Sequence, residues 1–261
     1  MNRIHPTKID KVIFAGILVL LVFAPLAFGS VHVWAYCIIE FGVFLLLALW
    51  FMDRLIVSST ENLSWVKTPI NLLVWLLMVF IGLQLVPLPS SVVALISPRT
   101  YADKQQLFTI LAKTTDASLD ELPWMSLTYY SHATRMEWLK LGAYAGMFFL
   151  VVNTLTSQKR IDILVFCLIS LGLFEALYAI YQVFSDAPRV WWWPSRTAPG
   201  NRASGTFVGA NHFAAYMGML VCLAFGFMIA LRPRSKALQP GLKGFRDSLQ
   251  RLVNNFSPES A

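Results

Sequence analysis

The stretch that decides the fold is RASGTFVGANHFAAYMGMLVCLAFGFMIAL, Arg202 to Leu231. A polar run of Arg, Ser, Gly, Thr, Asn and His stands directly before nineteen almost unbroken apolar residues, Phe213 to Leu231. A helix needs about 20 apolar residues to cross roughly 30 Å of hydrocarbon, so the apolar part is long enough to span a membrane. The polar run before it is typical either of a turn between two membrane helices or of an anion site at the start of a helix.

The composition of the whole chain indicates an integral membrane protein. Hydrophobic residues make up 57% of it and charged residues 13%, with a mean hydropathy of +0.60, which is more apolar surface than a soluble domain of 261 residues could bury. The apolar runs are continuous rather than alternating with a period of two, which favours helices. We therefore predict an all-α, polytopic transmembrane helical bundle with about six transmembrane helices. The expected spans are Val12 to Gly29, Val33 to Met52, Ile70 to Val86, Trp138 to Leu155, Ile163 to Phe184 and Phe213 to Leu231.

The distribution of charge predicts the topology. The net charge is +7, and thirteen of the 21 Lys and Arg lie before the first span, after the second, between the fourth and fifth, or after the sixth. The positive-inside rule then places the N- and C-termini in the cytoplasm. Because the basic residues lie at the ends of the spans, we expect the lipid bilayer to be their partner. We do not expect this protein to bind nucleic acid. The start of the chain also fits a signal peptide, although the second span follows almost at once, as in a helical hairpin.

The three cysteines fall inside spans, and no pair has the spacing of metal ligands, so we predict no disulfide, no metal site and no cofactor.

The spans divide the chain into five segments. The last segment fits an amphipathic helix on the anionic leaflet and a solvated basic tail equally well. The segments are helices one to three at 1–86, a periplasmic segment with short amphipathic helices at 87–137, helices four and five at 138–184, an Arg-rich periplasmic loop with the sixth helix at 185–231, and a basic cytoplasmic tail at 232–261.

Two carboxylic acids, Glu40 and Glu175, lie near the middle of expected spans. An ionised carboxylate at that depth costs at least a few kcal/mol, so each must be protonated, paired or beside water. A proton relay in a transporter is one interpretation. Neither span is interrupted in the way that marks a transporter site, which favours hydrogen bonding between helices. The Trp191 to Trp193 triplet fits either anchoring at the interface or stacking on sugar rings.

The run NRASGTFVGANHFAAYMGML resembles the R-x-S-G-T-F-x-N-x-N-H-F-A stretch of the O-antigen ligase and polysaccharide polymerase-like membrane proteins. Three upstream stretches are similar to the N-terminal half of the same family. This chain departs from the pattern at Gly209, where the family has Asn. The upstream stretches are PLAFGSVHVWAY, LQLVPLPSSVVALISP and PWMSLTYYSHATRMEWLKLGAYAGMFFLV.

The resemblance implies a metal-independent glycosyltransferase in the bacterial inner membrane. Such proteins move a glycan from undecaprenyl pyrophosphate to lipid A core, or to another glycan or protein acceptor. Their catalytic His and Arg come from an outer loop in a second half that has no counterpart here. The chain is therefore expected to be the N-terminal part, and its catalytic residues stay unassigned. The alternatives are a non-catalytic membrane subunit and a small transporter built around Glu40 and Glu175.

A pyrophosphate needs positive charge and hydrogen-bond donors, and Arg offers a forked donor. On the functional interpretation, backbone N–H groups of the turn and Arg202 face a phosphate at the start of the sixth helix, where the dipole favours anions. On the structural interpretation, Gly205 and Gly209 make a turn, Asn211 caps the helix and His212 faces the interface. The pyrophosphate-binding candidates are Arg202, Gly205, Asn211, His212, Arg196 and Arg189, and the weaker candidates are Arg135 and His132.

Overall fold

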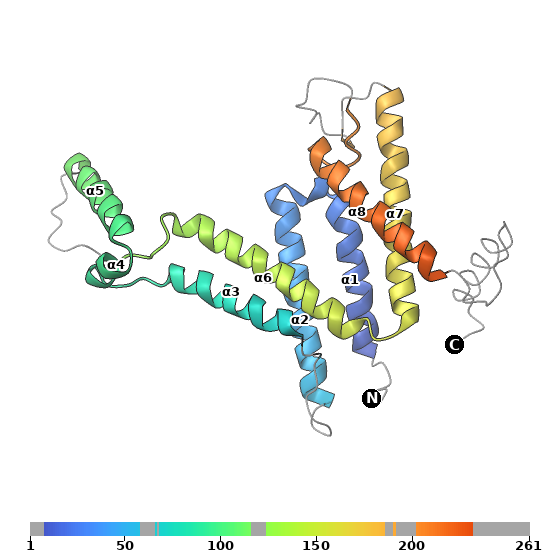
Figure 1. Ribbon diagram of the computed structural model, residues 1–261, viewed down its shortest axis with the longest axis horizontal. Coiled ribbons are helices and arrows are strands. Elements are labelled where there is room, and N and C mark those ends of the chain that lie inside the picture. Colours follow the sequence, from blue (N-terminus) through green and yellow to red (C-terminus); the bar gives the residue numbers. More distant parts are fainter. Residues whose placement is uncertain are drawn as a thin grey trace. The chain divides into compact units, whose positions relative to one another are not determined.

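The computed structural model describes residues 8–57, 66, 68–115, 124–185, 190–191 and 202–231. These residues form an all-helical fold, as predicted, and the chain divides into two compact units (Figure 1). Unit 1 contains α1 (Lys8–Leu26), the short 3-10 turn η1 (Phe28–Ser30), all but the last residue of α2 (Val33–Val57), α7 (Gln158–Phe184) and α8 (Ala210–Leu231). Unit 2 contains α3 (Pro69–Leu85), α4 (Ser90–Ile96), α5 (Pro98–Thr115) and α6 (Ser131–Thr154) as far as Leu150.

Four of the described helices, α1, α2, α7 and α8, are long and apolar enough to cross a membrane. They correspond to four of the six expected spans. The third expected span is α3, an apolar helix of 17 residues, and the fourth lies within α6 after several polar turns. Large apolar side chains on α2 and α8 are exposed, for example Phe41 at 70% and Phe225 at 63%. Such surfaces suit contact with lipid rather than water.

Helix α1 ends in an unusual left-handed turn. Phe28, Gly29 and Ser30 have φ angles of 59°, 64° and 57°, a region that side chains with a Cβ rarely adopt. The turn is held by the Ser30 hydroxyl, which donates to the carbonyl of Ala24 at 2.7 Å. A Cβ on Gly29 would lie 2.5 Å from the ring of Phe207, so the turn also needs glycine to admit that ring.

Helices α1 and α7 run side by side and parallel within unit 1 (Figure 1). At their N-terminal ends, Arg160 pairs with Asp10 at 2.7 Å and also donates to the carbonyl of Thr154 at 2.7 Å. The guanidinium lies 5.4 Å from the ring centre of Phe14. Because both charged groups are largely buried, this pair fixes the register of the two helices. The opposite ends of the same two helices form the site described below.

Unit 2 is organised around two helices that contact each other through a tryptophan. Trp138 of α6 donates its indole N–H to the carbonyl of Met78 in α3 at 3.0 Å, and its ring passes over Gly82. The chain enters α3 through Thr68, whose hydroxyl accepts from the amide of Asn71. Helices α4, of 7 residues, and α5, of 18 residues, lie in the segment 87–137.

Candidate functional site

The C-terminal end of α1 is closed by residues that lie far away in the sequence. A helix leaves its last four carbonyls without partners of its own. The hydroxyl of Thr206 donates to the carbonyl of Pro25 at 2.7 Å, and the indole N–H of Trp191 donates to the carbonyl of Leu26 at 3.0 Å. The segment between α7 and α8 therefore acts as the cap of α1, across more than 160 positions of sequence.

Glu175 of α7 is completely buried and contacts the same threonine. The amide of Thr206 donates to Glu175 Oε2 at 3.0 Å, and Thr206 Oγ1 lies 2.5 Å from Glu175 Oε1. Gly205 has a φ of +57°, and a Cβ there would lie 2.5 Å from Glu175 Oε2. Only glycine lets the turn approach the carboxyl group this closely. Gln182, further along the same face of α7, donates to the carbonyl of Gly205 at 2.9 Å.

Aromatic side chains cover the outer end of this cluster. Trp191 stacks on Tyr178 with ring centres 5.2 Å apart and lies 6.3 Å from Phe174. The amide of Trp191 donates to the Tyr178 hydroxyl at 2.9 Å. With its ring stacked on Tyr178 and its indole N–H bonded to the carbonyl of Leu26, Trp191 holds the segment before α8 against α7 and α1. Trp192 and Trp193 lie outside the described residues.

The start of α8 corrects one expectation. The amide of Phe213 donates to the carbonyl of Gly209 at 3.1 Å, which makes Gly209 the N-cap residue. Asn211 lies inside the first turn of α8 and is exposed, so the prediction that Asn211 caps this helix was wrong. The rings of Phe207, Phe213 and Tyr216 pack together below the cap.

The turn amides that were expected to face a phosphate are used inside the fold. The amide of Thr206 donates to Glu175, and that of Phe207 donates to the carbonyl of Ser204 at 3.0 Å. Gly205 is buried and presents no side chain. The anion or acid held by the turn is thus the side chain of Glu175. The candidates that remain at the surface of this segment are Arg202, Asn211 and His212, all of them exposed.

The other predicted residues lie elsewhere. His132 and Arg135 are exposed on the first turns of α6, in unit 2, where the His132 ring lies 5.9 Å from that of Tyr130. Glu40 is half-buried on α2. Arg189 and Arg196 lie outside the described residues, as does the basic tail. The favoured interpretation of Glu175 was hydrogen bonding between helices, whereas its observed partner is Thr206, in the turn before α8.

Two members of the site, Thr206 and Gln182, were missed by sequence reasoning. A signal for Gln182 was present, because it follows Glu175 by seven residues and so lies on the same face of α7. Two polar side chains on one face of an apolar helix predict a polar partner against that face. Thr206 lies within the stretch that resembles the family motif, but nothing in that stretch indicates its partners, which are 31 and 181 positions away.

A second polar cluster lies in unit 2. The ammonium group of Lys104 in α5 donates to the carbonyls of Ser126 and Thr128 at 2.5 and 2.7 Å, and to the Ser126 hydroxyl. Removal from water lowers the pKa of Lys104. Tyr129 adds a hydrogen bond to Asp103 at 2.7 Å. These contacts fasten the segment before α6 onto α5 and leave no donor of Lys104 for a ligand.

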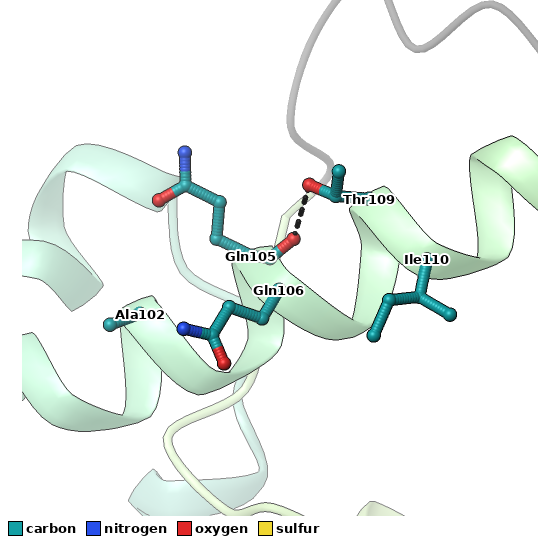
Figure 2. Close-up of a pocket in the computed structure, with 5 residues that line it drawn as sticks. All are labelled: Ala102, Gln105, Gln106, Thr109 and Ile110. Carbon is teal, nitrogen blue, oxygen red and sulfur yellow. Dashed lines mark hydrogen bonds between the residues drawn. The ribbon is translucent and has the colours of Figure 1, made fainter.

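Figure 2 shows the hollow found on α5, and it does not define a binding site. The residues that line it all come from α5, so no second element encloses a ligand there. Thr109 donates back to the carbonyl of Gln105 at 2.8 Å, which uses its hydroxyl within the helix. The lining residues are Ala102, Gln105, Gln106, Thr109 and Ile110.

The fold defines a polytopic helical protein with helices suited to a membrane, and a buried polar cluster that joins α1, α7 and the start of α8. Comparisons with known protein families, with curated proteins and with solved structures found no match for this chain.

Proposed function

We propose that this chain is the N-terminal membrane part of a glycosyltransferase of the O-antigen ligase type, which moves a glycan from undecaprenyl pyrophosphate to lipid A core or another acceptor. The observation that carries the proposal is the architecture of the stretch that resembles the family motif. It forms a turn fixed by Glu175, with Arg202 exposed before the turn and Asn211 and His212 exposed after it. A rigid, buried support beneath exposed cationic and polar groups is what an anionic head group requires.

The proposed roles follow from the chemistry of each group. The guanidinium of Arg202 offers two parallel donors to phosphate oxygens. Asn211 and His212 lie in the first turn of α8, where the helix dipole and the first amides favour an anion. Gly205 supports this surface from below, through its carbonyl bond to Gln182 and its contact with Glu175. The general base for the acceptor hydroxyl would come from the family's outer loop, not from these residues.

The proposed topology has six spans, with α3 and α6 added to α1, α2, α7 and α8, in the bacterial inner membrane. Both chain termini are cytoplasmic in this arrangement. It puts the segment before α8 at the outer face, where a lipid-linked glycan is presented. Support comes from the parallel course of α1 and α7, since two parallel helices cross the membrane in the same direction. The positive charge near their N-terminal ends then lies inside.

The test is the affinity for an undecaprenyl pyrophosphate analogue in detergent. Arg202→Ala should weaken binding about tenfold to a hundredfold, which corresponds to about 1.5 to 3 kcal/mol for hydrogen bonds to a charged group. Arg202→Lys should recover only part, because an ammonium group keeps the charge and loses the fork. Arg99→Ala is the matched control, since Arg99 is also an exposed arginine, on α5. Equal affinity for wild type and Arg202→Ala would refute the assignment.

A further inference from the structure

Three oxygen atoms form a buried chain between α1, the turn before α8, and α7. The carbonyl oxygen of Pro25 lies 2.7 Å from Thr206 Oγ1, and Thr206 Oγ1 lies 2.5 Å from Glu175 Oε1. The side chains of Thr206 and Glu175 are both fully buried. Distances this short between oxygen atoms require a proton in each gap.

The number of protons available decides the charge of Glu175. A hydroxyl has one proton to donate, and the carbonyl of Pro25 has none. If Glu175 were ionised, Thr206 could bond either to the carboxylate or to the Pro25 carbonyl, and the other contact would bring two acceptors together. If Glu175 is a carboxylic acid, it donates to Thr206 Oγ1, and Thr206 donates onward to Pro25. The fourth oxygen, Glu175 Oε2, then accepts from the amide of Thr206 as observed.

The surroundings of Glu175 agree with a neutral acid. Among the described residues no basic side chain contacts it, and a buried carboxylate without a cation is very unfavourable. From Val12 to Leu26, helix α1 carries no titratable side chain. On the turn, Arg202 is exposed while Glu175 is fully buried. The titratable side chains that interact with this part of the bundle are Tyr216 of α8 and Cys167 of α7.

We propose that Glu175 is an intramembrane proton-binding site: a protonated carboxylic acid whose proton, shared with Thr206, joins α7 to α1 through the turn before α8. This inference does not depend on the glycosyltransferase proposal. It gives the polar turn a reason to be buried in an apolar bundle, because a neutral acid, an amide and a hydroxyl satisfy one another there without any net charge. It also predicts that the variant Glu175→Gln keeps the hydrogen bonds of the site. The glutamine side chain would be able to donate to Thr206 Oγ1 and accept from the Thr206 amide, so this variant mimics the protonated acid.

The test is infrared difference spectroscopy on the full chain in lipid vesicles at neutral pH, with wild type compared to Glu175→Gln. The wild type should show the carbonyl band of a protonated carboxylic acid that Glu175→Gln lacks. Glu40→Gln is the matched control, because Glu40 is the other acid within an expected span and the band of Glu175 should survive its replacement. In Thr206→Val the band should shift, since the acid loses its acceptor.

Two results would overturn the proposal. The first is a difference spectrum that contains the stretching bands of an ionised carboxylate in place of the acid band. The second is an acid band that does not shift in Thr206→Val, which would mean that the proton is not donated to Thr206. If Glu175→Gln does not fold, the same decision comes from wild type labelled with ¹³C at the Glu carboxyl carbon and observed at neutral pH. One labelled signal must then be in the acid form, and complete ionisation of all signals would refute the assignment.

Discussion

Replacing Thr206 by Val removes one oxygen atom from the centre of the site and keeps the shape of the side chain. Two buried groups then lose a partner, the carbonyl of Pro25 and Glu175 Oε1. An unsatisfied buried group costs about 1 to 3 kcal/mol, whereas hydrogen bonds between membrane helices average about 0.6 and reach about 1.7 kcal/mol, because the unfolded chain in lipid finds other partners. With both groups fully inside the fold, we expect Thr206→Val to lower the free energy of unfolding by about 2 to 3 kcal/mol.

The assay is unfolding in mixed micelles by increasing fractions of SDS, followed by circular dichroism. Thr206→Ser is the matched control: it keeps the hydroxyl and removes a methyl group, which should cost about 1 kcal/mol at a fully buried position. Thr128→Val removes a hydroxyl that bonds Thr134 at 2.6 Å in a partly exposed place, and should cost less. If Thr206→Val were as stable as Thr206→Ser, the hydroxyl would not hold α1 and α7 together and the reasoning would fail.

Two further predictions concern topology and pH. Alkaline phosphatase, which is active only outside the cytoplasm, should be active when fused after Pro199 and inactive after Gln158 or Ser248. A fusion after Lys113 tests the number of spans, because it is active only if α3 and α6 both cross the membrane. Fusions that are inactive after Pro199 and active after Gln158 and Ser248 would contradict the orientation. Because burial lowers the pKa of Lys104, the unfolded chain binds more protons than the folded one between that lowered value and the ordinary lysine value of 10.5. The stability of unit 2 should therefore rise with pH in this window, measured by hydrogen exchange of the segment before α6, and Lys104→Met should remove the rise.

Hydropathy was sufficient to predict the long apolar helices, and it placed α3 as well without deciding whether α3 crosses a membrane. The segments that form α1, α2, α7 and α8 have long apolar runs, and their existence follows from composition alone. The segment of α3 has the same apolar character in 17 residues, a length between that of a core helix and that of a span. The polar first turns of α6 contact the preceding segment, for example through the hydrogen bond between Thr128 and Thr134. An average of hydropathy along the sequence carries no information about such contacts.

The candidate site was predictable only in part, because its contacts are non-local. Glu175 was identified from the cost of a carboxyl group within an apolar helix, which is a property of one residue in its own segment. Its partner Thr206 could be recognised only by knowing that α1 and α7 are parallel and end together. The cap of α1 shows the same limit, since Trp191 and Leu26 are 165 positions apart.

The polar turn illustrates why two interpretations of one sequence could be equally consistent with it. Glycine beside a hydrophilic run at the start of a helix provides N–H donors, and those donors suit a phosphate and a carboxyl group alike. Sequence shows that donors exist but not which group they meet. Here the amide of Thr206 meets Glu175, so the inward side of the turn is occupied by the protein's own acid. Any external anion must then be bound by groups that face away from Glu175, which is why Arg202 and the first turn of α8, rather than Gly205, are the residues to mutate.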